Sequence, residues 1–294
     1  MIFKQPKRKA TATDLQDLQR KLASFEDDIL PHLPEKDLIL ARAKARQLKK
    51  KRLLMGVSAG MGLLLSIYIY NPVYQQLNVQ TAKAQQKSIC LSDGSCLDLN
   101  SASEIQVSQR LRSREVTLIR GEVRFHVAHH HNALFKHFER PFMVRAGQLE
   151  ILDIGTIFNV LKHNQSDATV AVAQGEVAVK IHQQHIAPQH LYQGQSIRNV
   201  QHTLAAVSTL AVEDVSAWRK NELVFNQISI ADAIEQFQRY SDFAVEVVQP
   251  ELLQMQISGR FKTANYPAFM QILAVVAGLN VEKTANKHWK IEKK

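Results

Sequence analysis

The sequence predicts a multidomain membrane protein, in which a helical segment, one transmembrane helix, an all-β domain and a small α+β domain follow one another. Three observations predict this order: a basic stem at residues 1–52, a run of 22 uncharged residues at 53–74, and short alternating apolar patterns in the remaining chain. With 294 residues, 45% of them hydrophobic and 22% charged, the composition is that of a globular protein with room for about two domains.

The basic residues are concentrated in residues 1–52, which hold 14 Lys and Arg against 7 Asp and Glu and so carry most of the net charge of +10. Seven of these cations lie between Arg42 and Arg52, directly before the uncharged run. Cations beside a membrane span are expected on the cytoplasmic side, where they also attract anionic lipid. No groove-reading motif accompanies them, so we expect contact with the lipid bilayer and no direct binding of nucleic acid.

Residues 13–30 predict an amphipathic helix, and a second helix is expected from about residue 35 into the membrane. The apolar side chains of the first helix recur on one face: Leu15, Leu18, Leu22, Phe25 and Ile29. A short segment of this kind cannot form its own core, so the stripe requires a partner protein, a second copy of the chain or the membrane surface.

The uncharged run at 53–74 is long enough to cross a bilayer, which takes about 20 apolar residues. A secretory signal peptide would be shorter and nearer to the N-terminus, and a buried core helix is the other alternative. The flanking cations predict a cytoplasmic N-terminus and place residues 75–294 on the far side. Gly56 and Gly60 offer a small-residue face for pairing of two copies, although glycine is also common in membrane helices.

Residues 75–205 predict an all-β domain, either a sandwich or a solenoid-like fold, because no helical period appears in them. Glycines separate the expected strands, which are 115–119, 122–127, 141–146, 156–161, 168–173 and 176–181. Residues 206–217 are expected to be a linker. Residues 218–294 predict a small α+β domain of two strand–helix–strand units, with Ser229 capping the first helix.

Five segments of the β region follow one another in a recognisable order: CLSDGSCLDLN at 90–100, LIRGEVRFHV at 118–127, RPFMV at 140–144, IGTIFNV at 154–160 and VAVAQGEV at 170–177. They resemble the motifs of the FecR family of transmembrane signal transducers. The motif residues are Asp93, Gly94, Gly121, Glu122, Phe125, Pro141, Phe142, Phe158 and Gly175.

The segment from Trp218 to Ile291 is similar to the secretin and TonB short N-terminal domain found at the end of FecR-type proteins. The matching residues are Trp218, Leu223, Phe225, Ala233, Tyr240, Ile257, Ser258, Gly259 and Phe261. The two resemblances together cover roughly residues 85–293.

The resemblance implies a regulator in the inner membrane, with a periplasmic FecR-like domain that senses the signalling domain of a TonB-dependent outer-membrane receptor, often for iron–siderophore uptake. It also implies that the cytoplasmic segment controls an extracytoplasmic-function sigma factor, as an anti-sigma factor. The family's cytoplasmic domain carries tryptophans, whereas Trp218 and Trp289 are the only tryptophans of this chain. That difference favours an alternative, a membrane-anchored envelope binding or scaffold protein of the same fold without a sigma factor.

The resemblance further implies self-cleavage between Gly155 and Thr156 by an N-to-O acyl shift. A threonine hydroxyl can attack the preceding carbonyl if the turn is strained and an acceptor removes its proton. The alternative is a turn glycine followed by a β-branched strand residue.

Cys90 and Cys96 are the only cysteines, and they flank Ser-Asp-Gly-Ser. If Ser92 to Gly94 form a three-residue loop, the two cysteines lie opposite each other and can form a disulfide, which an oxidising compartment favours. A two-residue turn at Asp93-Gly94 would place them on opposite faces of the hairpin.

Five histidines lie in one stretch: His126, His129, His130, His131 and His137. Consecutive residues rarely face one ion, so we expect a solvated loop and no metal site. No nucleotide-binding or hydrolase motif is present, and Gly121-Glu122 and Gly175-Glu176 indicate structural turns. We therefore expect no cofactor, and no enzymatic activity other than the self-cleavage.

Overall fold

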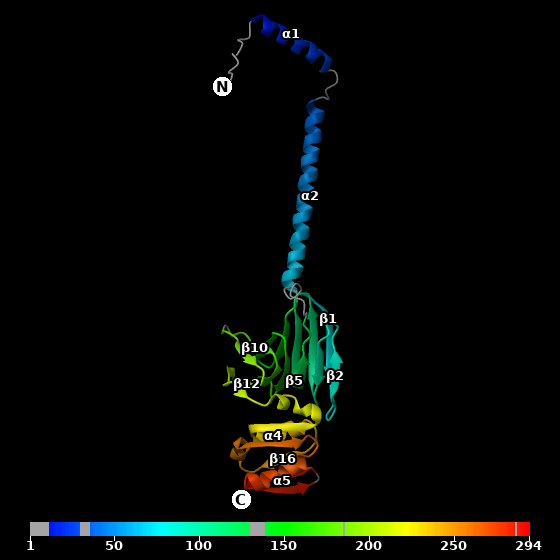
Figure 1. Ribbon diagram of the computed structural model, residues 1–294. Coiled ribbons are helices and arrows are strands. Elements are labelled where there is room, and N and C mark those ends of the chain that lie inside the picture. The colour runs from blue at the N-terminus through cyan, green and yellow to red at the C-terminus, as the bar shows by residue number, and fades with distance from the viewer. Residues whose placement is uncertain (1–11, 30–35, 130–138, 185, 286) are drawn as a thin grey trace, which may run out of the picture. The chain divides into compact units, whose positions relative to one another are not determined.

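A computed structural model of the chain describes residues 12–29, 36–129, 139–184, 186–285 and 287–294 (Figure 1). The chain divides into two compact units, Met1–Ile69 and Tyr70–Lys294. One long apolar helix precedes a large, mostly β region, so this part of the predicted fold class is confirmed.

The first unit contains α1 (Ala12–Ile29) and almost all of α2 (Lys36–Tyr70). The side chains of Leu15, Leu18 and Leu22 on α1 are exposed, as the amphipathic pattern predicts for a stripe without a partner. Helix α2 is long and apolar enough over Asp37–Tyr70 to cross a membrane.

Helix α2 ends at Tyr70 rather than at residue 74, which corrects the predicted boundary of the span. Asn71 adopts a left-handed φ of 51°, and Pro72 has no N–H to continue the helical hydrogen bonds. Strand β1 begins at Val73, so Tyr74 belongs to the β region, where its hydroxyl accepts a hydrogen bond from Arg140 (2.6 Å).

The β region of the second unit forms a 14-stranded sheet in the described part of the chain. Its strands are β1 (Val73–Gln80), β2 (Lys87–Cys90), β3 (Cys96–Leu99), β4 (Glu104–Arg110), β5 (Arg114–His126), β6 (Phe142–Ala146), β7 (Leu149–Asp153), β8 (Ile157–Lys162), β9 (Ala168–Gln174), β10 (Glu176–Ile181), β11 (Gln189–Tyr192), β12 (Gln195–Val200), β13 (Thr203–Leu204) and β14 (Ser208–Thr209).

Strand β5 belongs to both halves of this sheet. One half has the order β1-β4-β5-β6-β7-β10-β11, and the other has the order β2-β3-β5-β8-β9-β12. The two halves share one apolar core, in which the Phe125 ring stacks on Phe158 and meets the edge of Phe142.

Because β5 is continuous, the two strands predicted at 115–119 and 122–127 are one strand, and Gly121 is not a turn between them. Gly121 has a φ of 88°, and a Cβ there would collide with the backbone and side chain of Ser103. The glycine thus permits a bend at which β5 passes from one half of the sheet to the other.

The C-terminal elements form two strand–helix–strand units and a closing strand. They are β15 (Glu222–Ser229), α4 (Ile230–Gln238), β16 (Ala244–Val247), β17 (Gln256–Lys262), α5 (Tyr266–Val276), β18 (Leu279–Ala285) and β19 (His288–Lys293). Strand β15 pairs with β17, and β19 lies between β16 and β18. The Ser229 hydroxyl accepts the Asp232 N–H (3.0 Å) and so caps α4 as predicted.

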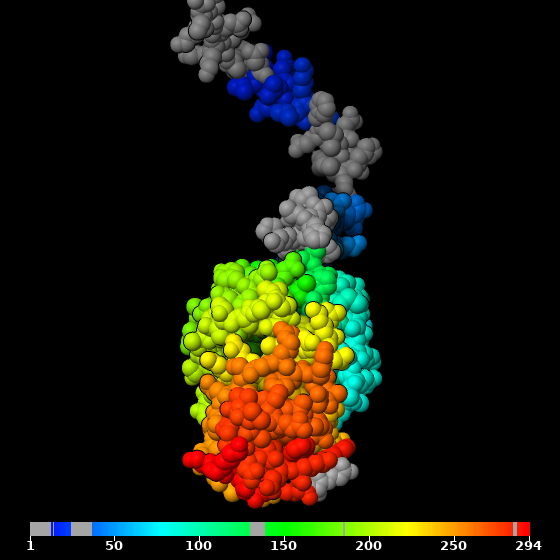
Figure 2. Space-filling view, turned by 60° about the horizontal axis from the view of Figure 1, so that its bottom comes forward, coloured from blue at the N-terminus to red at the C-terminus, as the bar shows by residue number. Residues whose placement is uncertain are grey.

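Residues 206–217 are not a free linker, which corrects the predicted domain boundary. Strand β14 pairs with β12, and 3₁₀ turns follow at Val212–Asp214 and Ala217–Lys220. Val215 is buried, so this segment belongs to the packed structure. The C-terminal elements, yellow to red, pack against one end of the β region (Figures 1 and 2).

Candidate functional site

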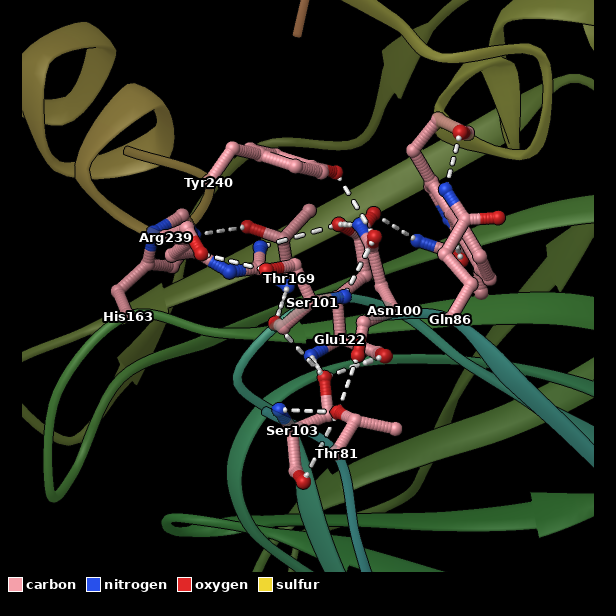
Figure 3. Close-up of polar contacts among 12 residues, drawn as sticks. Thr81, Gln86, Asn100, Ser101, Ser103, Glu122, His163, Thr169, Arg239 and Tyr240 are labelled. Atoms are coloured by element: carbon pink, nitrogen blue, oxygen red, sulfur yellow. Dashed lines mark hydrogen bonds and ion pairs between the residues drawn. The ribbon is translucent and has the colours of Figure 1, made fainter. Parts of the chain in front are cut away.

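Two polar clusters lie in the second unit. The Glu122 cluster joins the β region to the C-terminal elements and comprises Asn100, Glu122, Asn159, Trp218, Arg239 and Tyr240. Asn100, Glu122, Arg239 and Tyr240 are labelled in Figure 3. The Thr156 cluster lies at the predicted cleavage point and comprises Arg114, His129, Glu139, Asp153 and Thr156.

The buried carboxylate of Glu122 is the centre of the first cluster, and it follows directly after the bend at Gly121. Its Oε2 accepts the side-chain amide of Asn100 (2.8 Å) and pairs with Nη1 of Arg239 (3.0 Å). Its Oε1 accepts the side-chain amide of Asn159 (2.8 Å). Both carboxylate oxygens are therefore satisfied, and one of the partners comes from the end of α4.

The two asparagines extend this cluster toward the C-terminal elements. Oδ1 of Asn100 accepts the hydroxyl of Tyr240 (2.8 Å), and Oδ1 of Asn159 accepts Nε1–H of Trp218 (3.1 Å). Burial raises the pKa of Tyr240, so the phenol keeps the proton that it donates. The network thus fixes Trp218 and α4 against the β region through hydrogen bonds between buried groups.

His163 and two ion pairs lie at the rim of the same interface. Arg198 pairs with Asp232 of α4 (2.9 Å), and Arg219 pairs with Asp98 (3.1 Å). Burial lowers the pKa of His163 to about 4, and the nearby guanidinium of Arg198 adds to the shift. The ring is therefore neutral at pH 7, and its Nε2 lies 2.8 Å from the hydroxyl of Thr169 (Figure 3).

The sequence indicated only part of the Glu122 cluster. Glu122 was among the motif residues but was assigned to a structural turn, whereas the structure makes it the buried partner of Arg239. Arg239 was not singled out, because nothing in the local pattern of α4 marks it. An acidic residue inside a strand of alternating apolar residues is the available signal, since a buried carboxylate requires partners.

The Thr156 cluster forms where β7 ends and β8 begins. Gly155 has a φ of 115°, and Thr156 is buried. A Cβ at Gly175 would collide with the carbonyl oxygen of Gly155, so the absence of a side chain there lets the two backbones approach. The hydroxyl of Thr156 donates to Oδ1 of Asp153. The structure thus brings the predicted pair Gly155-Thr156 together with a proton acceptor.

A histidine lies on the other oxygen of the same carboxylate. Nε2 of His129 is 2.5 Å from Oδ2 of Asp153, and its Nδ1 is 3.1 Å from Oε1 of Glu139. Burial raises the pKa of Asp153, while the hydrogen bonds from Thr156 and His129 oppose that shift. His129 was predicted to lie in a solvated loop, but it is a neighbour of the predicted cleavage point.

Arg114 connects this cluster to the first motif. Its guanidinium pairs with Glu139 (3.3 Å) and with Asp93 (2.7 Å) at the tip of the β2–β3 hairpin. A cavity of about 380 Å³ opens beside these groups and is lined by Ser92, Asp93, Arg114, Ala128, His129, Glu139 and Arg140. The Thr156 cluster is therefore reached from solvent at its His129 end.

The hairpin that carries Asp93 is closed by a disulfide between Cys90 and Cys96. The N–H of Leu91 donates to the carbonyl of Ser95 (2.8 Å), so the loop between them is the three-residue one, with Gly94 at a φ of 86°. The two cysteines are direct cross-strand partners.

The other predicted positions have structural roles or lie outside the description. Phe125, Phe142 and Phe158 are core, the carbonyl of Pro141 accepts the Arg114 N–H (2.8 Å), and a Cβ at Gly259 would press on the Phe261 ring. His130, His131 and His137 lie outside the described residues, and within the described ranges no group of three metal-ligating side chains is found.

The comparisons with known proteins agree with the β architecture. The sequence model of the family described as FecR protein matches residues 78–178. Two crystal structures of a candidate anti-sigma factor from Parabacteroides distasonis ATCC 8503, at 2.50 and 1.65 Å resolution, each match with a TM-score of 0.63 and 20% identity. The first match covers 75% of this chain and 100% of the other, and the second covers 74% and 99%. At this identity the likeness shows the fold alone. No curated protein matches the chain.

Proposed function

Since residues 78–178 form a domain of the FecR family, we propose that this chain is a single-pass transmembrane regulator of a sigma factor. The observation that carries the proposal is the order of its parts: an exposed amphipathic helix, one apolar helix of membrane-spanning length, and a FecR domain of the fold seen in a candidate anti-sigma factor.

In this proposal α1 binds an extracytoplasmic-function sigma factor in the cytoplasm, and α2 crosses the inner membrane. The seven cations from Arg42 to Arg52 support a cytoplasmic N-terminus. The β region and the C-terminal elements then lie in the periplasm and receive the signalling domain of a TonB-dependent receptor, as in iron–siderophore uptake. Edge strands β16 and β18 offer backbone groups for such a partner.

The signal passes the membrane by regulated proteolysis or by a change in helix pairing, because a single helix transmits little by rigid motion. Gly56 and Gly60 support pairing of two copies, since they lie four positions apart on α2 and give it a small-residue face.

The sigma-factor proposal is tested with two variants of the full-length chain. Leu18→Asp places a charge on the apolar stripe of α1, and Gln16→Asp places the same charge on the opposite face. If Leu18 is buried in the complex with the sigma factor, its loss is expected to weaken binding by about 10-fold to 100-fold in the first variant, whereas the second variant should bind as the wild type does. Binding is measured by co-purification with each sigma factor of the cell, and transcription by a reporter.

If no sigma factor co-purifies with the wild-type chain and transcription is unchanged when the chain is deleted, the envelope scaffold alternative replaces this proposal.

We also propose that the chain cuts itself between Gly155 and Thr156. The buried hydroxyl of Thr156, its bond to Asp153 and the positive φ of Gly155 support this proposal. Thr156→Ala should leave only full-length protein on a blot, whereas the wild type yields fragments 1–155 and 156–294. Persistence of the same fragments in the Thr156→Ala variant, or their absence from the wild type, would refute self-cleavage.

A further inference from the structure

We propose that Asp153 is the catalytic base of this cleavage, and that His129 and Glu139 are positioning residues that hold its carboxylate on the Thr156 hydroxyl. The inference rests on the self-cleavage proposed above and assigns the residues that drive it. Its starting point is a relay of side chains that runs from the buried threonine to the cavity beside Arg114.

The contacts of Asp153 leave its two oxygens with separate tasks. Oδ1 accepts the hydroxyl of Thr156, which is the atom that must lose a proton before it attacks the carbonyl of Gly155. Oδ2 faces Nε2 of His129 (2.5 Å), and the backbone N–H of Gly155 also donates to the carboxylate. The base, the nucleophile and the peptide to be cut are thus held within one turn of four residues, 153–156.

Burial makes this carboxylate a better proton acceptor than an exposed aspartate would be. The side chain of Asp153 is fully shielded from solvent, and burial raises its pKa, so its basicity exceeds that of an ordinary aspartate. The opposing requirement is that the carboxylate stays ionised, and a cation in contact with it meets that requirement.

In the proposed relay the doubly protonated ring of His129 is that cation. Each of its ring nitrogens faces a carboxylate oxygen, of Asp153 on one side and Glu139 on the other, and only the doubly protonated ring can donate to both. Glu139 is held in turn by Arg114, which also binds Asp93. Among the described residues, the charged groups in contact along the relay are therefore the imidazole of His129, the guanidinium of Arg114 and three carboxylates, those of Asp93, Glu139 and Asp153. The guanidinium of Arg140 lines the same cavity.

The reaction balances without any group from outside except water. As Asp153 takes the hydroxyl proton, Oγ1 of Thr156 bonds to the carbonyl carbon of Gly155. The bond from that carbon to the Thr156 nitrogen then breaks, and the proton passes from Asp153 to the nitrogen, leaving an ester and a free amine. Water hydrolyses the ester to a carboxylate on Gly155 and restores the Thr156 hydroxyl.

The test follows cleavage of the full-length chain over time after cell-free synthesis. Asp153→Asn keeps the size of the side chain and an acceptor for the hydroxyl but removes the base, so cleavage should slow by about 100-fold or more. His129→Gln should slow cleavage less and move the acidic limb of the rate profile to higher pH, because Asp153 loses its cation. His126→Gln alters an exposed histidine at the end of β5 and is the matched control, with an unchanged rate.

Rescue by free imidazole distinguishes a positioning role of the His129 ring from a purely structural role. The cavity beside His129 is open, so free imidazole should restore part of the rate in a His129→Gly variant. Resistance to limited proteolysis equal to that of the wild type verifies that each variant has folded.

Each outcome decides between the two proposals. Fragments of unchanged size from Thr156→Ala would refute self-cleavage itself. If Thr156→Ala abolishes the fragments while Asp153→Asn cleaves at the wild-type rate, self-cleavage stands and the base assignment is refuted. A folded His129→Gly variant that imidazole does not accelerate, or a His129→Gln variant with an unchanged pH profile, refutes the positioning role.

Discussion

The Glu122 and Thr156 clusters each contain a buried carboxylate, yet their surroundings differ. The carboxylate of Glu122 is bound by two asparagine side chains and the guanidinium of Arg239. Within that guanidinium, only Nε has no hydrogen-bond partner among the described residues. Asp153 instead contacts a hydroxyl and a histidine that is 27% exposed beside a cavity. A carboxylate such as Glu122, whose partners are all permanent hydrogen-bond donors, holds two parts of a fold together. A carboxylate such as Asp153, which lies between a hydroxyl nucleophile and an imidazole, can take up and release a proton.

The largest loss of stability is expected when the Glu122 cluster loses its central carboxylate. Glu122→Ala leaves the largely buried guanidinium of Arg239 without its carboxylate partner, so the free energy of unfolding should fall by about 3 to 5 kcal/mol. The matched control is Glu104→Ala, which breaks a solvent-exposed pair with Arg120 and should cost less than about 1 kcal/mol. Urea unfolding of the full chain in detergent measures the free energy of unfolding of both variants. Equal losses would show that the Glu122–Arg239 pair stabilises the fold no more than a surface ion pair does.

A second change disturbs the Thr156 cluster without replacing any of its polar side chains. Gly175→Ala forces a Cβ onto the Gly155 carbonyl at a φ of 83°, and should cost about 2 to 4 kcal/mol and alter the cleavage rate. Gly94→Ala has a similar φ of 86° but only an ordinary contact with Ala128, so about 1 kcal/mol is expected. Thermal unfolding compares the two, and a smaller loss at Gly175 would contradict the crowding.

Acid should lower the free energy of unfolding through His163, which lies at the rim of the interface that contains the Glu122 cluster. Because burial lowers the pKa of this ring to about 4, the folded protein keeps it neutral while the unfolded chain takes up a proton near pH 6.5. Stability is then unaffected above pH 6.5 and falls as the pH drops toward 4, by about 2 to 3 kcal/mol. His163→Gln should remove this part of the pH dependence of the urea midpoint; an unchanged slope would exclude His163 as its source.

The smallest effect is expected from the hairpin disulfide. Replacing Cys90 and Cys96 together by serine frees a short loop, which is worth about 2 kcal/mol in the chain-entropy account. The same change loosens Asp93 from Arg114, so cleavage should slow while the Glu122 cluster is unaffected. Proteolysis between the β region and the C-terminal elements reports on the second point, and a gain in proteolysis there would show that the two clusters are coupled.

The local elements of this fold were accessible from sequence because short-range patterns determine them. The alternation of apolar residues located the strands, and Ser229 located the start of α4. The pattern misled at Gly121, where the buried positions change phase between Leu118 and Val123. A phase change indicates a break or a bulge, and only pairing with neighbouring strands distinguishes the two.

The candidate sites were less accessible, because their contacts join distant parts of the chain. Glu122 and Arg239 are 117 positions apart, and no local periodicity relates them. Gly155-Thr156 was identified by resemblance, but the acceptor Asp153 was not named. The role of His129 could not be read from the histidines next to it in the sequence, since its contacts are with Glu139, ten positions later, and with Asp153 at the end of β7.

The order of the strands determines how the two fragments would be held together after a cut that follows Gly155. Strands β1 to β7 precede the cut and β8 to β14 follow it, yet β5 pairs with β8 and β7 pairs with β10. The two fragments would therefore remain associated through these strand pairings without a covalent link. Under a sustained pull on the C-terminal elements, the lifetime of the molecule would then depend on these two strand pairings and on the Glu122 cluster, which also joins residues on either side of the cut, rather than on a peptide bond.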